Sequence, residues 1–194
     1  KDADLLGYGS FDAESLRALM ADVVAVEVST PDGLTFDPGT VTIEDIRDAA
    51  EYGGYRVKLR AHLDGADIPL QVDLALGEAV TPGPVEVTVP SLLDHDPPRL
   101  RAYPVETVIA EKFEAMVKPG LANSRLKDYY DLWYILTRLS HDPDIVARAV
   151  AATFGRRGTA LPEKTPAGLT DAYGDDDRKR QWRSFLDRTA ATDR

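Results

Sequence analysis

A chain of 194 residues that is 43% hydrophobic and 29% charged has the size and composition of a globular protein with one domain or two small lobes. No apolar run approaches the roughly 20 residues that a helix needs to cross a bilayer, so the sequence predicts no membrane-spanning helix. The chain contains no cysteine, which excludes disulfides, thiolate zinc sites and cysteine nucleophiles and suits the cytoplasmic location that we expect.

Charge is distributed unevenly along the chain. Residues 1–97 carry 6 basic and 19 acidic side chains, a balance of −13, whereas residues 98–194 carry 17 basic and 14 acidic ones, a balance of +3. The overall charge of −10 argues against a simple nucleic-acid coat protein. The acidic half suits metal binding and the more basic half suits contact with phosphates; two solvated surfaces of opposite sign remain the alternative.

The first fifty residues predict a strand, a helix and a turn. Residues 1–6 have the pattern of a strand already under way, and residues 11–28 have helical periodicity with Asp12 as the N-cap. Pro31-Asp32-Gly33 predicts a turn before a short extended piece, and residues 41–50 fit either the end of a strand or a short helix.

The clearest pattern is an antiparallel hairpin. Apolar and polar residues alternate over 55–64 and again over 68–76, with a turn at Asp64-Gly65 between them. A loop at Gly65-Ala66 would place Lys58 directly across from Asp73. Val85, Val87 and Val89 indicate one more strand.

Beyond Pro97-Pro98 the pattern becomes helical. Helices are predicted over 105–118, 124–139, 142–154 and 175–188, with a loop rich in Gly, Pro and Thr over 155–174. An antiparallel sheet lobe over residues 1–98 followed by a helical lobe over 99–194 is an α+β arrangement.

Three carboxylates are candidate metal ligands. Asp2 and Asp4 are two apart on a strand and so share a face, and Asp73 lies on the non-apolar face of another strand. Carboxylates that converge repel one another unless a cation lies between them, and Mg²⁺ prefers such oxygen ligands together with substrate phosphates. A solvated strand edge is the alternative explanation of Asp2 and Asp4, and an ion pair with Lys58 would explain Asp73.

Lys112 interrupts the apolar stripe of its predicted helix. It lies four residues after Val108 and three after Ile109. A lysine at this position extends to solvent, pairs with Glu106 or Glu111, or faces a polar cleft that could hold a triphosphate.

Asp128 and Asp131 share a face of the next helix, and the apolar residues around them predict that the helix is largely buried. Local pairs of Arg125 with Asp128 and of Lys127 with Asp131 would satisfy them. The functional alternative is that Asp128 orients Lys112 or activates an attacking hydroxyl.

The adjacent Arg156 and Arg157 lie between glycines, a pattern that could grip phosphate or an RNA backbone or form an ordinary solvated turn. His62, His95 and His141 are scattered and lack metal-ligand spacing, and neither a P-loop nor a dinucleotide-binding glycine motif is present.

Four segments occur in an order that resembles the AbiEii/AbiGii nucleotidyltransferase family, to which the mycobacterial MenT toxins belong, over nearly the whole chain. They are Lys1-Asp2-Ala3-Asp4-Leu5-Leu6, Gln71-Val72-Asp73, Ala110-Glu111-Lys112-Phe113-Glu114-Ala115-Met116 and Ser124-Arg125-Leu126-Lys127-Asp128-Tyr129-Tyr130-Asp131-Leu132.

The resemblance implies a polymerase-beta-like nucleotidyltransferase lobe and a toxin of a toxin–antitoxin or phage-defence system. It implies that Asp2 and Asp4 bind Mg²⁺ with Asp73 as a third acidic position, that Lys112 contacts the NTP, and that activity requires Asp128. We assign the basic residues Arg125 and Lys127 of the same motif to nucleotide binding. The expected reaction moves a nucleotide from an NTP to an RNA acceptor, the tRNA 3′ end, and the expected partner is a cognate antitoxin.

Family members carry a glycine-rich segment ending in Gly-Ser or Gly-Thr before the paired aspartates, and nothing precedes Lys1 here. We therefore expect that an N-terminal piece of the fold is missing. Two alternative functions follow: a non-catalytic module that binds an antitoxin or RNA, and nucleotide transfer to a protein hydroxyl.

Overall fold

The computed structural model describes residues 2–28, 31–47, 53–76, 80–91, 94 and 96–189. The chain divides into two compact units, Lys1–Glu78 and Ala79–Arg194. Each unit is described by itself. Lys1, residues 48–50 and His95, on which predictions were made, lie outside the described residues, as does the side chain of Asp2.

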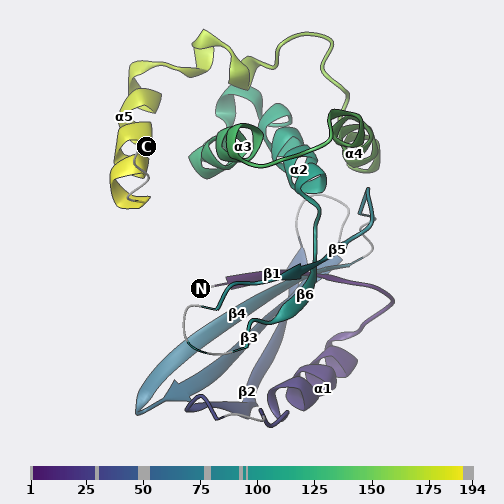
Figure 1. The fold of residues 1–194 in the computed structure, drawn as a ribbon, viewed down its shortest axis with the longest axis vertical. Helices are drawn as coiled ribbons and strands as arrows, with labels where there is room; N and C mark the ends of the chain where they lie inside the picture. Colours follow the sequence, from purple (N-terminus) through teal and green to yellow (C-terminus); the bar gives the residue numbers. More distant parts are fainter. Residues whose placement is uncertain are drawn as a thin grey trace. The chain divides into compact units, whose positions relative to one another are not determined.

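The first unit is a four-stranded sheet with one helix (Figure 1). The strands β1 (Asp2–Gly7), β2 (Leu34–Arg47), β3 (Gly53–Leu63) and β4 (Ala66–Leu76) lie in the order β1-β4-β3-β2. β1 runs parallel to β4, and the other pairs are antiparallel. The extended piece predicted after the turn at Pro31-Asp32-Gly33 is thus the start of a long strand, whose register with β3 shifts between Asp37 and Thr42.

The hairpin of β3 and β4 is confirmed, and its loop is the predicted turn Asp64-Gly65. The loop Gly65-Ala66, which would have placed Lys58 across from Asp73, is not formed. Both loop residues have positive φ, 44° and 80°, the conformation of the tight turn that matches the twist of paired strands. Moving the loop by one residue changes every pair across it. Lys58 therefore faces Gln71, and Arg56 faces Asp73.

One face of the sheet is apolar and packs against helix α1 (Ala13–Val24). Leu16 of α1 is buried against Val57, Leu59 and Leu74 of the sheet. Asp12 caps the helix as predicted, since its side chain accepts a hydrogen bond from the Ser15 amide at 2.7 Å. The helix ends at Val24, earlier than its predicted end, and the β-branched Val26 and Val28 that follow are exposed.

The second unit begins with a small antiparallel pair and continues with helices (Figure 1). Strand β5 (Val85–Thr88) was predicted, whereas its partner β6 (Arg99–Ala102) was not, because it is short and highly charged. The helices are α2 (Val105–Val117), α3 (Leu126–Arg138), α4 (Pro143–Arg156) and α5 (Asp176–Thr189), all close to their predicted ranges.

The core of this unit lies where α3 and α4 pack against α2. Ile109, Met116 and Leu132 are its buried centre, with Phe113 and Val146 against them. The region 155–174 contains two short 3₁₀ turns, Ala167–Leu169 and Asp171–Tyr173. The predicted α+β class is confirmed. None of the helices in the described part of the chain is long and apolar enough to cross a membrane.

Candidate active-site residues

Two of the predicted acidic residues lie opposite each other on neighbouring strands. The parallel register of β1 and β4 pairs Asp4 with Asp73, so their side chains leave the same face of the sheet about 5 Å apart at the backbone. This is the face away from α1. Asp2 is opposite Gln71 in the same register.

Arg56 of β3 holds Asp73 in place. Its Nε donates to Asp73 Oδ1 at 2.8 Å and its Nη2 to Oδ2 at 2.7 Å, a two-pronged ion pair, while Gln71 Nε2 lies 3.2 Å from Oδ1. The hydrogen bonds from Arg56 keep the pKa of Asp73 below its usual value, although burial acts in the opposite direction. The predicted partner, Lys58, instead binds both oxygens of Glu44 on β2 at 2.7 and 2.8 Å.

The pairing of Arg56 with Asp73 was not predicted, because a partner for Asp73 was inferred only for a loop at Gly65-Ala66 and not for the turn at Asp64-Gly65. The signal was present, since Arg56 belongs to the same alternating polar face as Lys58 and lies across from Asp73 once the loop is Asp64-Gly65. Gly54, two residues before Arg56, shows how closely the strands approach here. A Cβ at Gly54 would lie 2.7 Å from the Leu74 carbonyl oxygen, so this position requires glycine.

The oxygen chemistry of this face fits a hard cation in part. Asp4 and Asp73 supply carboxylates on one face, as Mg²⁺ requires, but both oxygens of Asp73 are engaged by a guanidinium. A cation bound at Asp73 would have to share or displace that arginine. Within the described residues, no cluster of three or more acidic or histidine side chains has the geometry of a metal site.

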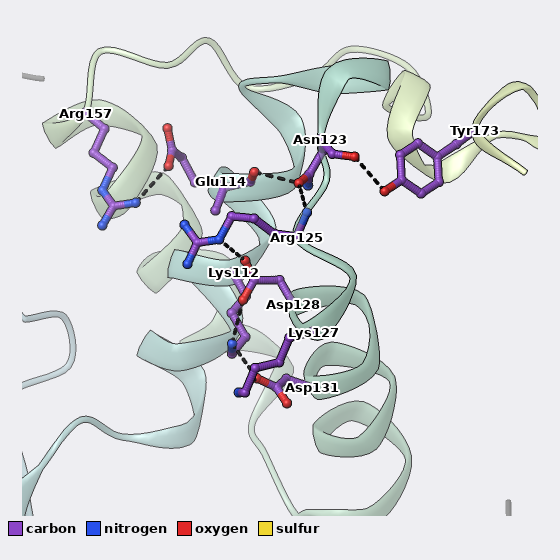
Figure 2. A network of polar contacts seen from close by, with 10 residues as sticks. Lys112, Glu114, Asn123, Arg125, Lys127, Asp128, Asp131, Arg157 and Tyr173 are labelled. Atoms are coloured by element: carbon purple, nitrogen blue, oxygen red, sulfur yellow. Dashed lines mark hydrogen bonds and ion pairs between the residues drawn. The ribbon is translucent and has the colours of Figure 1, made fainter. Parts of the chain in front are cut away.

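Lys112 of α2 is bound by two carboxylates of α3 (Figure 2). Its Nζ lies 2.8 Å from Asp128 Oδ1 and 2.6 Å from Asp131 Oδ2, and its side chain is 19% exposed. The alternative prediction, an ion pair of Lys112 with Glu106 or Glu111, is not observed. Burial by itself lowers the pKa of Lys112, but the hydrogen bonds that its amine donates to the two aspartates outweigh burial and raise the pKa above its usual value, so the amine is charged at neutral pH.

The two aspartates differ in their surroundings. Asp128 is buried, with 4% of its surface exposed, and Arg125 Nε lies 2.9 Å from its second oxygen, Oδ2, as an ion pair without aligned hydrogen-bond geometry. Asp131 binds Lys127 at 2.5 Å in addition to Lys112. Both local pairs considered from the sequence are therefore present. Burial raises the pKa of Asp131, yet its bonds to Lys112 and Lys127 prevail and lower it.

Asn123 fixes the loop that leads into α3 (Figure 2). This buried side chain accepts a hydrogen bond from the Arg125 amide at 2.8 Å and lies 3.4 Å from the Ala115 carbonyl of α2, while the Tyr173 hydroxyl donates to its backbone oxygen at 2.8 Å. It ties α2 to the start of α3 and so to Arg125. Asn123 was not predicted from the sequence, because it lies two residues before the N-cap Arg125 and is therefore not at the capping position.

Arg156 and Arg157 form neither an exposed phosphate grip nor a solvated turn. Arg156 binds Glu111 at 2.5 Å, and Arg157 binds both Glu111 and, at 2.8 Å, the buried Glu114. Thr159 donates to Glu114 at 2.5 Å as well. The arginines at the end of α4 thus neutralise two acids on α2 and join the two helices.

A sequence model for the nucleotidyl transferase AbiEii toxin, type IV toxin–antitoxin system, matches residues 1–194. The α+β fold, with a mixed sheet followed by helices, agrees with this match. The match places the chain in the class of nucleotidyltransferase toxins. The chain belongs to the AbiEii family. No curated protein and no solved structure shows a significant match to it.

Proposed function

We propose that this chain is the toxin of a cytoplasmic toxin–antitoxin pair and transfers a nucleotide from an NTP to the 3′ end of an RNA, a tRNA in the first instance. Membership of the AbiEii family carries the class of reaction and implies an antitoxin partner. The observation that most supports specific roles is the binding of Lys112 by Asp128 and Asp131, in which a charged amine is held in place by two carboxylates.

In this proposal Asp2 and Asp4 hold Mg²⁺, with Asp73 as the third acidic position. The ion, when bound, supplies positive charge at the phosphate that is transferred. The register of Asp4 with Asp73 supports the assignment, and the engagement of Asp73 by Arg56 indicates that Asp2 and Asp4 contribute more to binding.

Lys112 would neutralise the triphosphate, and Arg125 and Lys127 would contribute further positive charge to it. The exposed positions of Arg125 and Lys127, at 2.9 and 2.5 Å from the two aspartates, leave their charged groups within reach of a ligand. The burial of Asp128 favours a role in positioning Lys112 over direct activation of an RNA hydroxyl, because a buried carboxylate reaches a substrate only if the helix moves.

The test is a transfer assay with α-³²P-labelled NTPs, Mg²⁺ and total tRNA, resolved on both RNA and protein gels. We expect label in the RNA, and we expect Asp4→Asn to abolish it. Asp22→Asn is the matched control, because Asp22 is an exposed carboxylate on α1 of the same unit, and it should retain full activity. Undiminished transfer by Asp4→Asn would contradict the metal assignment.

The same assay separates the alternatives. Label on a protein band and none on RNA would assign the transfer to a protein hydroxyl. The absence of any transfer, together with NTP binding that does not depend on Mg²⁺, would indicate a binding module without turnover.

A further inference from the structure

An aromatic surface joins α3 and α5. It consists of five rings, Tyr130, Trp133, Tyr134, Trp182 and Phe185. The ring of Tyr130 is central, with centroids 5.7 Å from Trp133, 6.5 Å from Tyr134, 6.5 Å from Trp182 and 6.0 Å from Phe185. Trp182 and Phe185 lie 5.5 Å apart on α5.

The packing of α5 against α3 accounts for three of the five rings but not for the exposure of the other two. Tyr130, Trp182 and Phe185 are half-buried where the two helices meet. Trp133 and Tyr134, by contrast, are 43% and 45% exposed. An exposed tryptophan beside an exposed tyrosine is costly in water, and such patches mark contact sites for a partner.

The charges around the aromatic surface identify the kind of partner. Side chains three or four residues away along a helix are its neighbours. The basic residues at those positions are Lys127, Arg138, Arg178, Lys179 and Arg188. The acidic residue at such a position is Asp131, which pairs with Lys112 and Lys127, and Lys179 lies 3.7 Å from the exposed Asp176. The five basic residues outnumber these two acids, so the surroundings of the rings are positively charged. Flat rings surrounded by cations complement a polyanion whose bases can stack.

We propose that the aromatic surface binds single-stranded RNA, with bases stacked on Trp133 and Tyr134 and phosphates bound by the surrounding lysines and arginines. The inference rests on the proposed function, for which it supplies the acceptor-binding surface. Its position supports this link: Tyr130 and Tyr134 are on the helix that carries Asp128 and Asp131, so a strand stacked there lies within a few helical turns of the Lys112 cluster.

The test measures RNA binding without any transfer reaction. Both tryptophans of the chain belong to the aromatic surface, so a single-stranded octanucleotide should quench the intrinsic fluorescence of the 194-residue protein. Anisotropy of the fluorescein-labelled octanucleotide then gives a Kd for each variant. We expect Tyr134→Ala and Trp133→Ala to weaken binding by about tenfold or more.

Leu161→Ala is the matched control. Leu161 is a 54% exposed apolar residue in the segment between α4 and α5, outside the aromatic surface, so its loss should change the Kd less than twofold. Circular dichroism establishes that each variant is folded. Duplex RNA of the same length should bind more weakly than the single strand, because its bases are not free to stack on the rings.

No quenching by the octanucleotide, equal affinity for duplex RNA, or an unchanged Kd in both folded ring variants would each overturn the proposal. If both folded ring variants kept the wild-type Kd for RNA but lost binding to the antitoxin, the rings would be assigned to a protein partner. RNA binding that depends on the rings in a chain without transfer activity would refute the proposed function alone. Transfer activity with ring-independent binding would refute this inference alone.

Discussion

Lys112 Nζ lies 2.8 Å from Oδ1 of Asp128, a carboxylate that is otherwise enclosed by the helices of the second unit. The lysine within the apolar stripe of α2 is thus neither extended into solvent nor buried alone. A second carboxylate, Asp131, shares the amine and is itself shared with Lys127. The arrangement couples α2 to α3 through charge, and its strength can be measured.

Asp128→Asn is expected to lower the free energy of unfolding by about 1–3 kcal/mol, because it removes a charged acceptor from a largely buried amine. Lys127→Ala should lower it by no more than about 1 kcal/mol, since Lys127 is exposed and its pair with Asp131 is screened. Urea unfolding followed by circular dichroism measures both. Equal losses in the two variants would show that the buried pair contributes no more than the exposed one.

The cluster of Lys112, Asp128 and Asp131 makes the free energy of unfolding depend on pH in both the acidic and the alkaline range. The pKa of Asp131 is lowered in the folded protein, so its contribution is present above the unfolded value of about 3.9 and is lost as the pH falls through the folded pKa. The pKa of Lys112 is raised, so its contribution is present below about 10.4 and is lost as the pH rises through the folded pKa.

Asp131→Asn should therefore flatten the fall in unfolding free energy between pH 5 and pH 2, as measured by urea titrations across that range. Asp144→Asn, an exposed carboxylate at the start of α4, is the control and should leave the profile largely unchanged. A wild-type profile in the Asp131 variant would mean that the ion pairs of Asp131 do not persist in solution.

Arg56 is expected to oppose cation binding at Asp73. Arg56→Ala frees both oxygens of Asp73 from the guanidinium, leaves the longer contacts from Gln71 and removes a positive charge, so Mn²⁺ should bind several-fold more tightly than to the wild type. Arg60→Ala is the control. Arg60 lies four residues further along the same face of β3 and pairs with Asp67, so its removal takes away one positive charge but should change the Mn²⁺ affinity little. Electron paramagnetic resonance of free Mn²⁺ reports the affinities. Identical affinities in the two variants would exclude Asp73 from the cation site.

The pairs of Glu111 and Glu114 with the arginines of α4 predict a large stability effect. Arg157→Ala leaves Glu114, 2% exposed, without its arginine, and should cost about 3–5 kcal/mol. Arg148→Ala, at an exposed position of the same helix, should stay within about 0.5 kcal/mol. Thermal and urea unfolding measure both, and a loss near 0.5 kcal/mol for Arg157→Ala would show that water or Thr159 compensates for the missing cation.

Several elements were predictable because their signals are local. The capping residue Asp12, the alternation of β3 and β4, and the ranges of the four helices of the second unit follow from residues close together in the chain. The strand β6 was missed because its alternation of two arginines with Leu100 and Ala102 is only four residues long, too short to distinguish from a loop without its pairing with β5. The hairpin turn at Asp64-Gly65 was predicted, but the partner of Asp73 was inferred for a loop at Gly65-Ala66, one position later, which assigned Asp73 to Lys58 instead of Arg56.

The amino-acid sequence by itself determined the α+β class and the order of the elements, because local periodicity and turn chemistry specify them. The motifs that resemble the AbiEii family likewise lie in the sequence. The tertiary structure decided which charges meet: Asp4 opposite Asp73, Arg56 on Asp73, Lys112 on two carboxylates, and the arginines of α4 on Glu111 and Glu114. An ion pair between distant residues depends on register and helix packing, to which every residue of the elements contributes, so spacing along the chain does not reveal it.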